Sequence, residues 1–149
     1  MGETLARALV KMLDNVTWEI DLITPVPLGL ARLAERGYNQ SSLLARPVSL
    51  ALDVPYRPQI LSRARETRSQ VGLTATERRL NVSGAFVAHP DWVKGRSILV
   101  VDDVTTSGST LDACAEALFT AGARQVYGLT LARAVFKSPH LSDQPILES

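Results

Sequence analysis

The chain has 149 residues, of which 46% are hydrophobic and 21% are charged, and its formal net charge is +1 at pH 7. This length and composition are typical of one globular domain with a real core, and the near-zero charge gives no indication of a broad attraction to nucleic acid or to an anionic membrane. The single cysteine, Cys114, excludes an intramolecular disulfide and a zinc module built on paired cysteines from this sequence.

The sequence of the first part of the chain predicts one helix before a strand and another helix after it. An amphipathic pattern predicts a helix over residues 4–14, and its charges distinguish it from a signal peptide. An apolar run predicts a buried strand over residues 19–24, stopped by Pro25. A short helical turn is then broken at Gly37, and Asn39 is a suitable N-cap for the helix that follows.

The middle of the chain predicts a long loop between two short strands. Ile60 and Leu61 begin the first strand, and residues 84–88 form the second. Residues 64–74 have no apolar period and contain Arg65 and Arg68, so we expect a loop there. Long loops in compact domains are often functional lids, which is the interpretation we give to this one.

The last part of the chain predicts a strand over residues 97–103, a helix over 109–123 and a further strand over 124–135. Strands alternate with helices, and two strands are almost uniformly apolar, so we predict a three-layer α/β fold with a mostly parallel sheet. We assign this domain to residues 1–138 and a loosely ordered C-terminal tail to residues 139–149.

The sequence ILVVDDVTTSGST, residues 98–110, carries the chemistry. Asp102 and Asp103 follow an apolar strand, and the carboxyl ends of such strands are where ligands bind in open α/β sheets. The loop after them is rich in hydroxyls, and Gly108 lets its backbone approach a phosphate at the start of a helix. Carboxylates suit sugar hydroxyls or a metal, so the stretch predicts a ribose 5-phosphate site. The alternative is a polar helix cap in which Asp102 pairs with an arginine.

These 13 residues resemble the phosphoribosyl pyrophosphate signature of type I phosphoribosyltransferases. The segments PVPLGLARLAERGYNQ and RARETRSQVGLTATERRLNVSGAF, followed by the signature, further resemble the ComF-type competence family. Members of that family commonly carry a cysteine-rich zinc module, for which this chain has no cysteines beyond Cys114. The resemblance implies a phosphoribosyltransferase fold and a Mg²⁺-dependent transfer of ribose 5-phosphate from phosphoribosyl pyrophosphate to a base or amine that the sequence does not identify.

The resemblance also implies roles for individual residues. Metal would bind through substrate oxygens, with Asp102 reaching it through water at most. Arg63, Arg65 and Arg68 would lie on the lid, where guanidinium groups stabilise a departing pyrophosphate. The residues implied are, for ribose 5-phosphate, Asp102, Asp103, Thr106, Ser107, Gly108, Ser109 and Thr110; for pyrophosphate, Val26, Pro27, Leu28, Arg32 and Arg36; and for catalysis, Asp102, Asp103, Arg65 and Arg68.

Two other classes of function stay open. One is a non-catalytic, ligand-sensing protein that keeps the ribose-phosphate site, and the other is an accessory protein for DNA uptake, as the word competence suggests. We expect phosphoribosyl pyrophosphate or a nucleoside monophosphate as the ligand and a homodimer as the assembly. No apolar run reaches the roughly 18 residues that a membrane span needs, so we expect a cytoplasmic protein.

Overall fold

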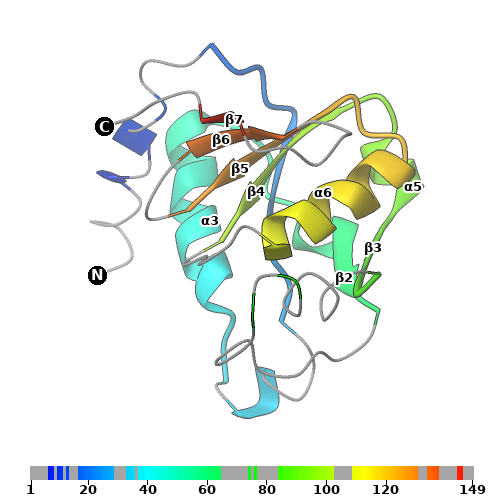
Figure 1. Cartoon of the computed structure of the whole chain (residues 1–149). Helices are drawn as coiled ribbons and strands as arrows, with labels where there is room; N and C mark the ends of the chain where they lie inside the picture. The colour runs from blue at the N-terminus through cyan, green and yellow to red at the C-terminus, as the bar shows by residue number, and fades with distance from the viewer. Residues whose placement is uncertain are drawn as a thin grey trace.

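A five-stranded sheet forms the centre of the described part of the chain (Figure 1). The computed structural model describes residues 7–8, 10–11, 13, 17–28, 33–35, 37–64, 74, 76, 84–102, 109–130, 134–137 and 144–145. Across the sheet the order of the strands is β1 (Leu22–Pro25), β4 (Ser97–Val101), β5 (Gln125–Leu129), β6 (Ala134–Lys137) and β7 (Gln144–Pro145). The first three are parallel, and β6 and β7 are antiparallel additions.

Residues 55–57 run along the other edge of β1. The Ile23 N–H donates to the Pro55 carbonyl (2.9 Å), the Arg57 N–H donates to the Ile23 carbonyl (2.8 Å), and Ile23 and Tyr56 form a parallel bridge. The chain therefore leaves β1 toward one edge of the sheet and leaves β4 toward the other. The carboxyl ends of β1 and β4 form the point where the strand order reverses, which is the usual ligand site of open α/β sheets.

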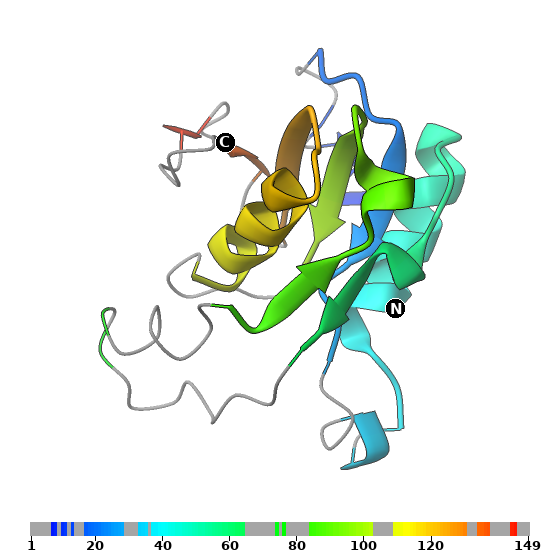
Figure 2. The same ribbon diagram turned by 90° about the vertical axis from the view of Figure 1, so that its right-hand side faces the viewer.

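Two helices cover opposite faces of this sheet, as Figure 2 shows. The side chains of β4 alternate between the faces: Ile98 and Val100 pack in the cluster that contains residues of α6 (Ser109–Thr120), whereas Leu99 and Val101 pack with α3 (Gln40–Leu52). Both faces of β4 are therefore buried, which explains its uninterrupted apolar sequence. The predicted three-layer α/β fold with a mostly parallel sheet is confirmed.

A small antiparallel hairpin lies beside α6. After the 3₁₀ turn η1 (Pro58–Ile60), β2 (Leu61–Arg63) pairs with β3 (Phe86–Ala88), and the short helix α5 (Pro90–Val93) leads from β3 to β4. Ile60, Leu61 and Phe86 are buried in the same cluster as α6, so the hairpin extends the core on that side of the sheet.

Two predicted strands need correction. The predicted strand over 124–135 is two antiparallel strands, β5 and β6, and the LAR sequence between them contains none of the usual turn residues. The predicted strand over 19–24 begins later, at Leu22, and includes Pro25. The backbone nitrogen of residue 25 points to the same edge of β1 as that of Ile23, toward residues 55–57. It lies beyond the last hydrogen bond between those residues and β1, so a proline at position 25 removes no hydrogen-bond donor from this pairing.

The ends of the chain are described only in part. Residues 7, 8, 10 and 11 are helical, within the helix predicted over 4–14, and Leu13 is buried against the α3 side of the sheet. The strand β7 lies in the segment that we assigned to a tail, and the division at residue 138 stays a prediction. No helix in the described ranges has the length and apolar character to cross a membrane.

Candidate functional site

The two strands at the reversal point are tied together beyond their ends. Val26 follows β1, and its N–H donates to the carbonyl of Val101 at 3.0 Å. Asp102 follows β4, and its N–H donates to the carbonyl of Leu129 in β5 at 2.9 Å. The backbones of Val26 and Asp102 are thereby held as extensions of the sheet, at the edge where the sequence predicted a ligand.

Asp102 is buried, with 7% of its surface exposed. Its carboxylate accepts a hydrogen bond from the hydroxyl of Ser41, with Oγ 3.2 Å from Oδ1. Ser41 lies in the first turn of α3 and is itself buried. The protein thus supplies this carboxylate with a donor of its own, which lowers the cost of burying the charge.

Asn39 connects the start of α3 to the segment after β1. Its side-chain oxygen accepts from the Ser41 N–H (3.0 Å), which confirms the predicted N-cap, and its Nδ2 donates to the Val26 carbonyl (3.1 Å). A chain of hydrogen bonds therefore runs from Val26 through Asn39 and Ser41 to Asp102. The sequence predicted the cap, but neither of the two contacts that Asn39 and Ser41 make with the sheet edge.

The helix α6 begins a few residues after Asp102. Its first turn brings orphan N–H groups and the positive end of the helix dipole to this end of the sheet, the arrangement that binds phosphates in many proteins. Leu111 and Cys114 are buried against the sheet and hold that turn in place. Of the predicted phosphate residues, Ser109 and Thr110 form the first two positions of α6.

Charges of both signs act on Cys114. Burial raises the pKa of its thiol far above the ordinary value, the negative charge of Asp102 raises this pKa further, and the positive charge of Arg63 lowers it. Asp102 and Arg63 therefore both lie close enough to α6 to influence one thiol. Arg63 ends β2, with its guanidinium carbon 4.7 Å from the centre of the Phe86 ring, so our placement of Arg63 on the lid is wrong.

The pyrophosphate segment is described at Val26, Pro27 and Leu28. Val26 is buried, and Pro27 and Leu28 are half-buried at the end of β1. The other predicted site residues lie outside the described residues: Arg32, Arg36, Arg65, Arg68, Asp103, Thr106, Ser107 and Gly108. The structure therefore brings together Asp102, the segment of residues 26–28 and the start of α6, and it leaves the remaining assignments as predictions.

The described side chains at this site are suited to a metal ion that binds mainly through the phosphate groups of a substrate. Within the described ranges, no group of three His, Cys, Asp or Glu side chains is placed to hold a metal ion. Mg²⁺ commonly keeps several waters and binds one or two carboxylates together with substrate phosphates. Among the described residues at this edge, the buried carboxylate of Asp102 fits that mode.

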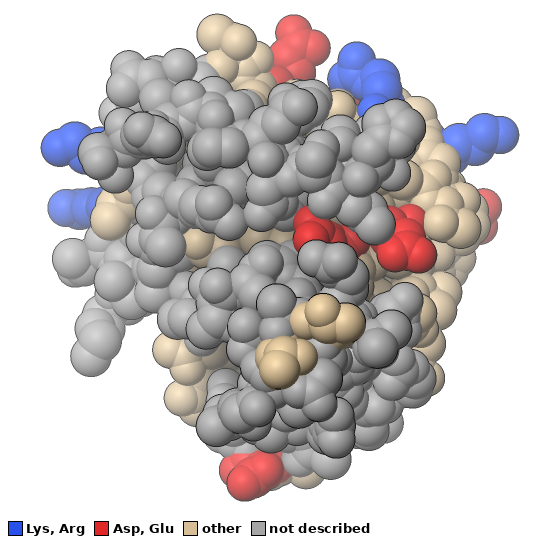
Figure 3. Space-filling view, in the orientation of Figure 1, with Lys and Arg blue, Asp and Glu red and all other residues tan. Residues whose placement is uncertain are grey.

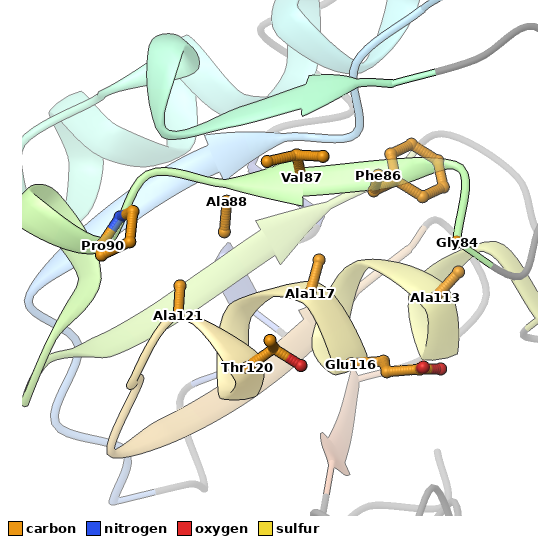
Figure 4. A pocket seen from close by; sticks show the side chains of 10 residues that line it. All are labelled: Gly84, Phe86, Val87, Ala88, Pro90, Ala113, Glu116, Ala117, Thr120 and Ala121. Atoms are coloured by element: carbon orange, nitrogen blue, oxygen red, sulfur yellow. The ribbon is translucent and has the colours of Figure 1, made fainter.

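A concave surface lies between β3 and α6, away from the sheet edge that holds Asp102 (Figure 4). It has a volume of about 320 Å³, and its walls include Phe86 and Ala88 on one side and, on the other, Ala113 and Ala117 of α6 with Ala121 just after that helix. Small side chains on α6 let the hairpin approach closely. Among the described residues that line this groove, the charged one is Glu116, which repels a phosphate, so the end of the sheet beside the start of α6 is the better candidate site.

Comparison with protein families and curated proteins gives one consistent result. The family model described as the phosphoribosyl transferase domain matches residues 2–137. Competence protein F of Haemophilus influenzae is 39% identical over 141 residues, covering 90% of this chain and 62% of that protein. The DNA utilization protein YhgH of Escherichia coli K12 is 38% identical over 115 residues, covering 77% of this chain and 50% of that protein. The matched part of the chain thus spans 50–62% of the length of these relatives.

Solved structures with the same fold include two enzymes. Glutamine phosphoribosylpyrophosphate amidotransferase from Bacillus subtilis superposes with a TM-score of 0.58 at 22% identity, covering 88% of this chain and 27% of that one. Adenine phosphoribosyltransferase from Thermoanaerobacter pseudethanolicus superposes with a TM-score of 0.54 at 18% identity, covering 85% of this chain and 66% of that one. At these identities the likeness concerns the fold.

Proposed function

This chain belongs to the phosphoribosyl transferase domain family, among the ComF-type competence proteins, and we propose that it binds phosphoribosyl pyrophosphate and transfers its ribose 5-phosphate to a base or amine. One observation carries the proposal. The buried carboxylate of Asp102, the segment after β1 and the first turn of α6 meet at the reversal point of the sheet, where a sugar phosphate finds acceptors for its hydroxyls and donors for its phosphate.

Asp102 is suited to a sugar by its acceptors. A carboxylate offers about four lone-pair sites on its two oxygens, and the hydroxyl of Ser41 donates to Oδ1. We propose that Asp102 and Asp103 together accept hydrogen bonds from the ribose hydroxyls. Residues 106–110 would cradle the 5-phosphate at the start of α6, through backbone N–H groups and short hydroxyls.

The proposed reaction separates charge at the C1 atom of the ribose. As the bond from C1 to pyrophosphate breaks, positive charge develops on the sugar, and a fixed carboxylate beside it stabilises that charge. Negative charge develops on the departing pyrophosphate, which residues 26–28 would receive, with Arg32 and Arg36 following them and Arg65 and Arg68 on the lid. When bound, Mg²⁺ would neutralise further charge on the pyrophosphate, and Asp102 is the described residue that would help to hold it, through water.

Thermal unfolding with ligand tests the proposal. A ligand at 100 times its dissociation constant stabilises the folded state by about 2.7 kcal/mol, which for a domain of this size raises Tm by roughly 5–10 °C. We expect this shift with phosphoribosyl pyrophosphate plus Mg²⁺, and a smaller one with a nucleoside monophosphate. Sodium phosphate at equal ionic strength is the control. The same Tm with millimolar ligand and with the control would contradict the proposal.

A second candidate function is a non-catalytic role in competence, as a ligand sensor or an accessory to DNA uptake. The names of the relatives, competence protein F and DNA utilization protein, favour it. Among the side chains that the structure describes, Figure 3 shows acidic groups over α6 and basic groups toward the periphery of this face. Release of pyrophosphate in the presence of candidate bases and amines separates a transferase from a sensor that binds the same ligand.

The assembly is a separate proposal. We propose a homodimer, and light scattering on the purified protein measures its mass against the 16.2 kDa of one chain. A mass equal to a single chain across the working range of concentrations would contradict it.

A further inference from the structure

We propose that Ser41 and Asn39 are positioning residues of the site, each for a different part of the ligand: Ser41 orients Asp102 toward the ribose, and Asn39 fixes the segment of residues 26–28 for the pyrophosphate. This inference rests on the proposed function and goes beyond it, because the motif that implied the site assigns no role to either residue. The two side chains are two positions apart at the start of α3, on the far side of the sheet from α6.

Ser41 acts on one side of the site. Its hydroxyl and the Asp102 carboxylate are both buried, with relative exposures of 4% and 7%, and their contact spans 61 positions of sequence. Asp102 is also held by its own N–H on the Leu129 carbonyl. With backbone and Oδ1 both anchored, rotation about the end of the side chain is restricted. The orientation of the carboxylate toward a sugar is thus set before any ligand arrives.

Asn39 acts on the other side. Its carboxamide uses both ends: the oxygen caps α3 at Ser41 N, and the nitrogen holds the Val26 carbonyl. The Val26 N–H is held in turn by Val101. The peptide groups on both sides of Val26 are therefore fixed, which positions the next residues, Pro27 and Leu28, where the pyrophosphate is proposed to bind. The rigid first turn of α3 joins the two functions.

Two substitutions separate these roles. Ser41→Ala removes the hydroxyl from Asp102 and leaves Asn39 in place. Asn39→Ser keeps a good N-cap for α3 but is too short to reach the Val26 carbonyl. The probes are ribose 5-phosphate alone and inorganic pyrophosphate with Mg²⁺, titrated calorimetrically into the full chain. Ser49→Ala is the matched control, because Ser49 is also buried in α3 and its hydroxyl bonds to the Val54 carbonyl, away from the site.

The expected result is a crossed pattern. Ser41→Ala lowers the affinity for ribose 5-phosphate by about tenfold or more, as expected for the loss of a hydrogen bond to a charged group. It leaves the affinity for pyrophosphate within about twofold of the wild-type value. Asn39→Ser lowers the affinity for pyrophosphate by about three- to tenfold and leaves the affinity for ribose 5-phosphate nearly unchanged. Ser49→Ala changes neither. Ser41→Thr, which keeps a hydroxyl, retains the wild-type ratio of the two affinities.

The readout is the ratio of the two affinities within one variant, which partial unfolding leaves unchanged because it lowers both apparent affinities equally. Equal losses for both probes in each variant, or no loss in either, would overturn the positioning roles while the proposed function stands. If Ser41→Ala does not fold, Ser41→Gly, which also removes the hydroxyl, takes its place, and the ratio in Asn39→Ser tests the other role. A wild-type chain that binds neither probe overturns the proposed function itself, and the inference with it.

Discussion

Asp102 is the side chain on which the proposed chemistry most depends. Asp102→Asn keeps the shape of the group and an acceptor for the Ser41 hydroxyl, but removes the charge. We expect the free energy of unfolding to change by no more than about 1 kcal/mol, because an amide is less costly to bury than a carboxylate. Affinity for ribose 5-phosphate falls by about tenfold or more, measured by calorimetry, because hydrogen bonds to a charged acceptor are the stronger ones.

Glu116→Gln is the matched control for this charge removal, since Glu116 is exposed on α6 and faces the groove beside β3. We expect it to bind ribose 5-phosphate as the wild type does. Equal affinity of Asp102→Asn and wild type would favour the helix-cap interpretation, in which Asp102 serves the structure alone.

Cys114 makes the stability depend on pH in the alkaline range. Its pKa is raised in the folded state by burial first, and the unfolded thiol ionises near its ordinary value of 9.0. Above that pH the unfolded chain has lost a proton that the folded chain keeps, so stability falls as pH rises, by about 1.4 kcal/mol per pH unit. Cys114→Ala lacks this loss.

Urea unfolding at two pH values measures the effect of the thiol. Between pH 8 and pH 10, we expect the wild type to lose about 1.4 kcal/mol more than Cys114→Ala. Other groups that titrate in this range, such as Tyr127 with its raised pKa, are present in both proteins and cancel in the difference. Parallel pH profiles of the two proteins would show that the thiol does not contribute.

The helix α3 connects the core to the site, and its two faces differ sharply. Leu44 is 3% exposed and packs against β1 and β4, whereas Leu50, in the same helix, is 83% exposed. Leu44→Ala leaves a cavity, and we expect it to lower the free energy of unfolding by about 2–5 kcal/mol. Leu50→Ala should stay within about 0.5 kcal/mol of wild type. Urea denaturation of both variants measures the difference, and equal values would mean that α3 does not pack as described.

The topology of the sheet indicates which backbone amides a bound ligand should protect from hydrogen exchange. If phosphoribosyl pyrophosphate binds at the reversal point, hydrogen exchange should slow at the amides of Val26, Leu28 and Asp102 and in the first turn of α6. The amides of Val87 and Thr120, which line the groove between β3 and α6, should exchange as before. Mass spectrometry of exchanged peptides with and without ligand and Mg²⁺ measures both. Protection confined to the groove would move the site there.

Local patterns in the sequence determined the layers and one half of the site. Apolar runs bounded by polar turns predicted β4 and α6, because a strand buried on both faces and a helix with one apolar face each leave their own period. The cap at Asn39 was also predictable, since it depends on a neighbour two residues away. The signature at residues 98–110 pointed to the sheet edge for the same reason: strand, loop and helix are contiguous there.

Only the tertiary structure decided which residues from distant parts of the chain make contact at that sheet edge. The contact of Ser41 with Asp102, the contact of Asn39 with Val26 and the position of Arg63 on β2 join residues that are far apart in the chain or set by strand pairing. A single sequence carries no periodic signal for such pairs, because they depend on which strands become neighbours. The reversal of strand order at β1 and β4 made these pairs possible, and it is a property of the folded sheet and of no local segment.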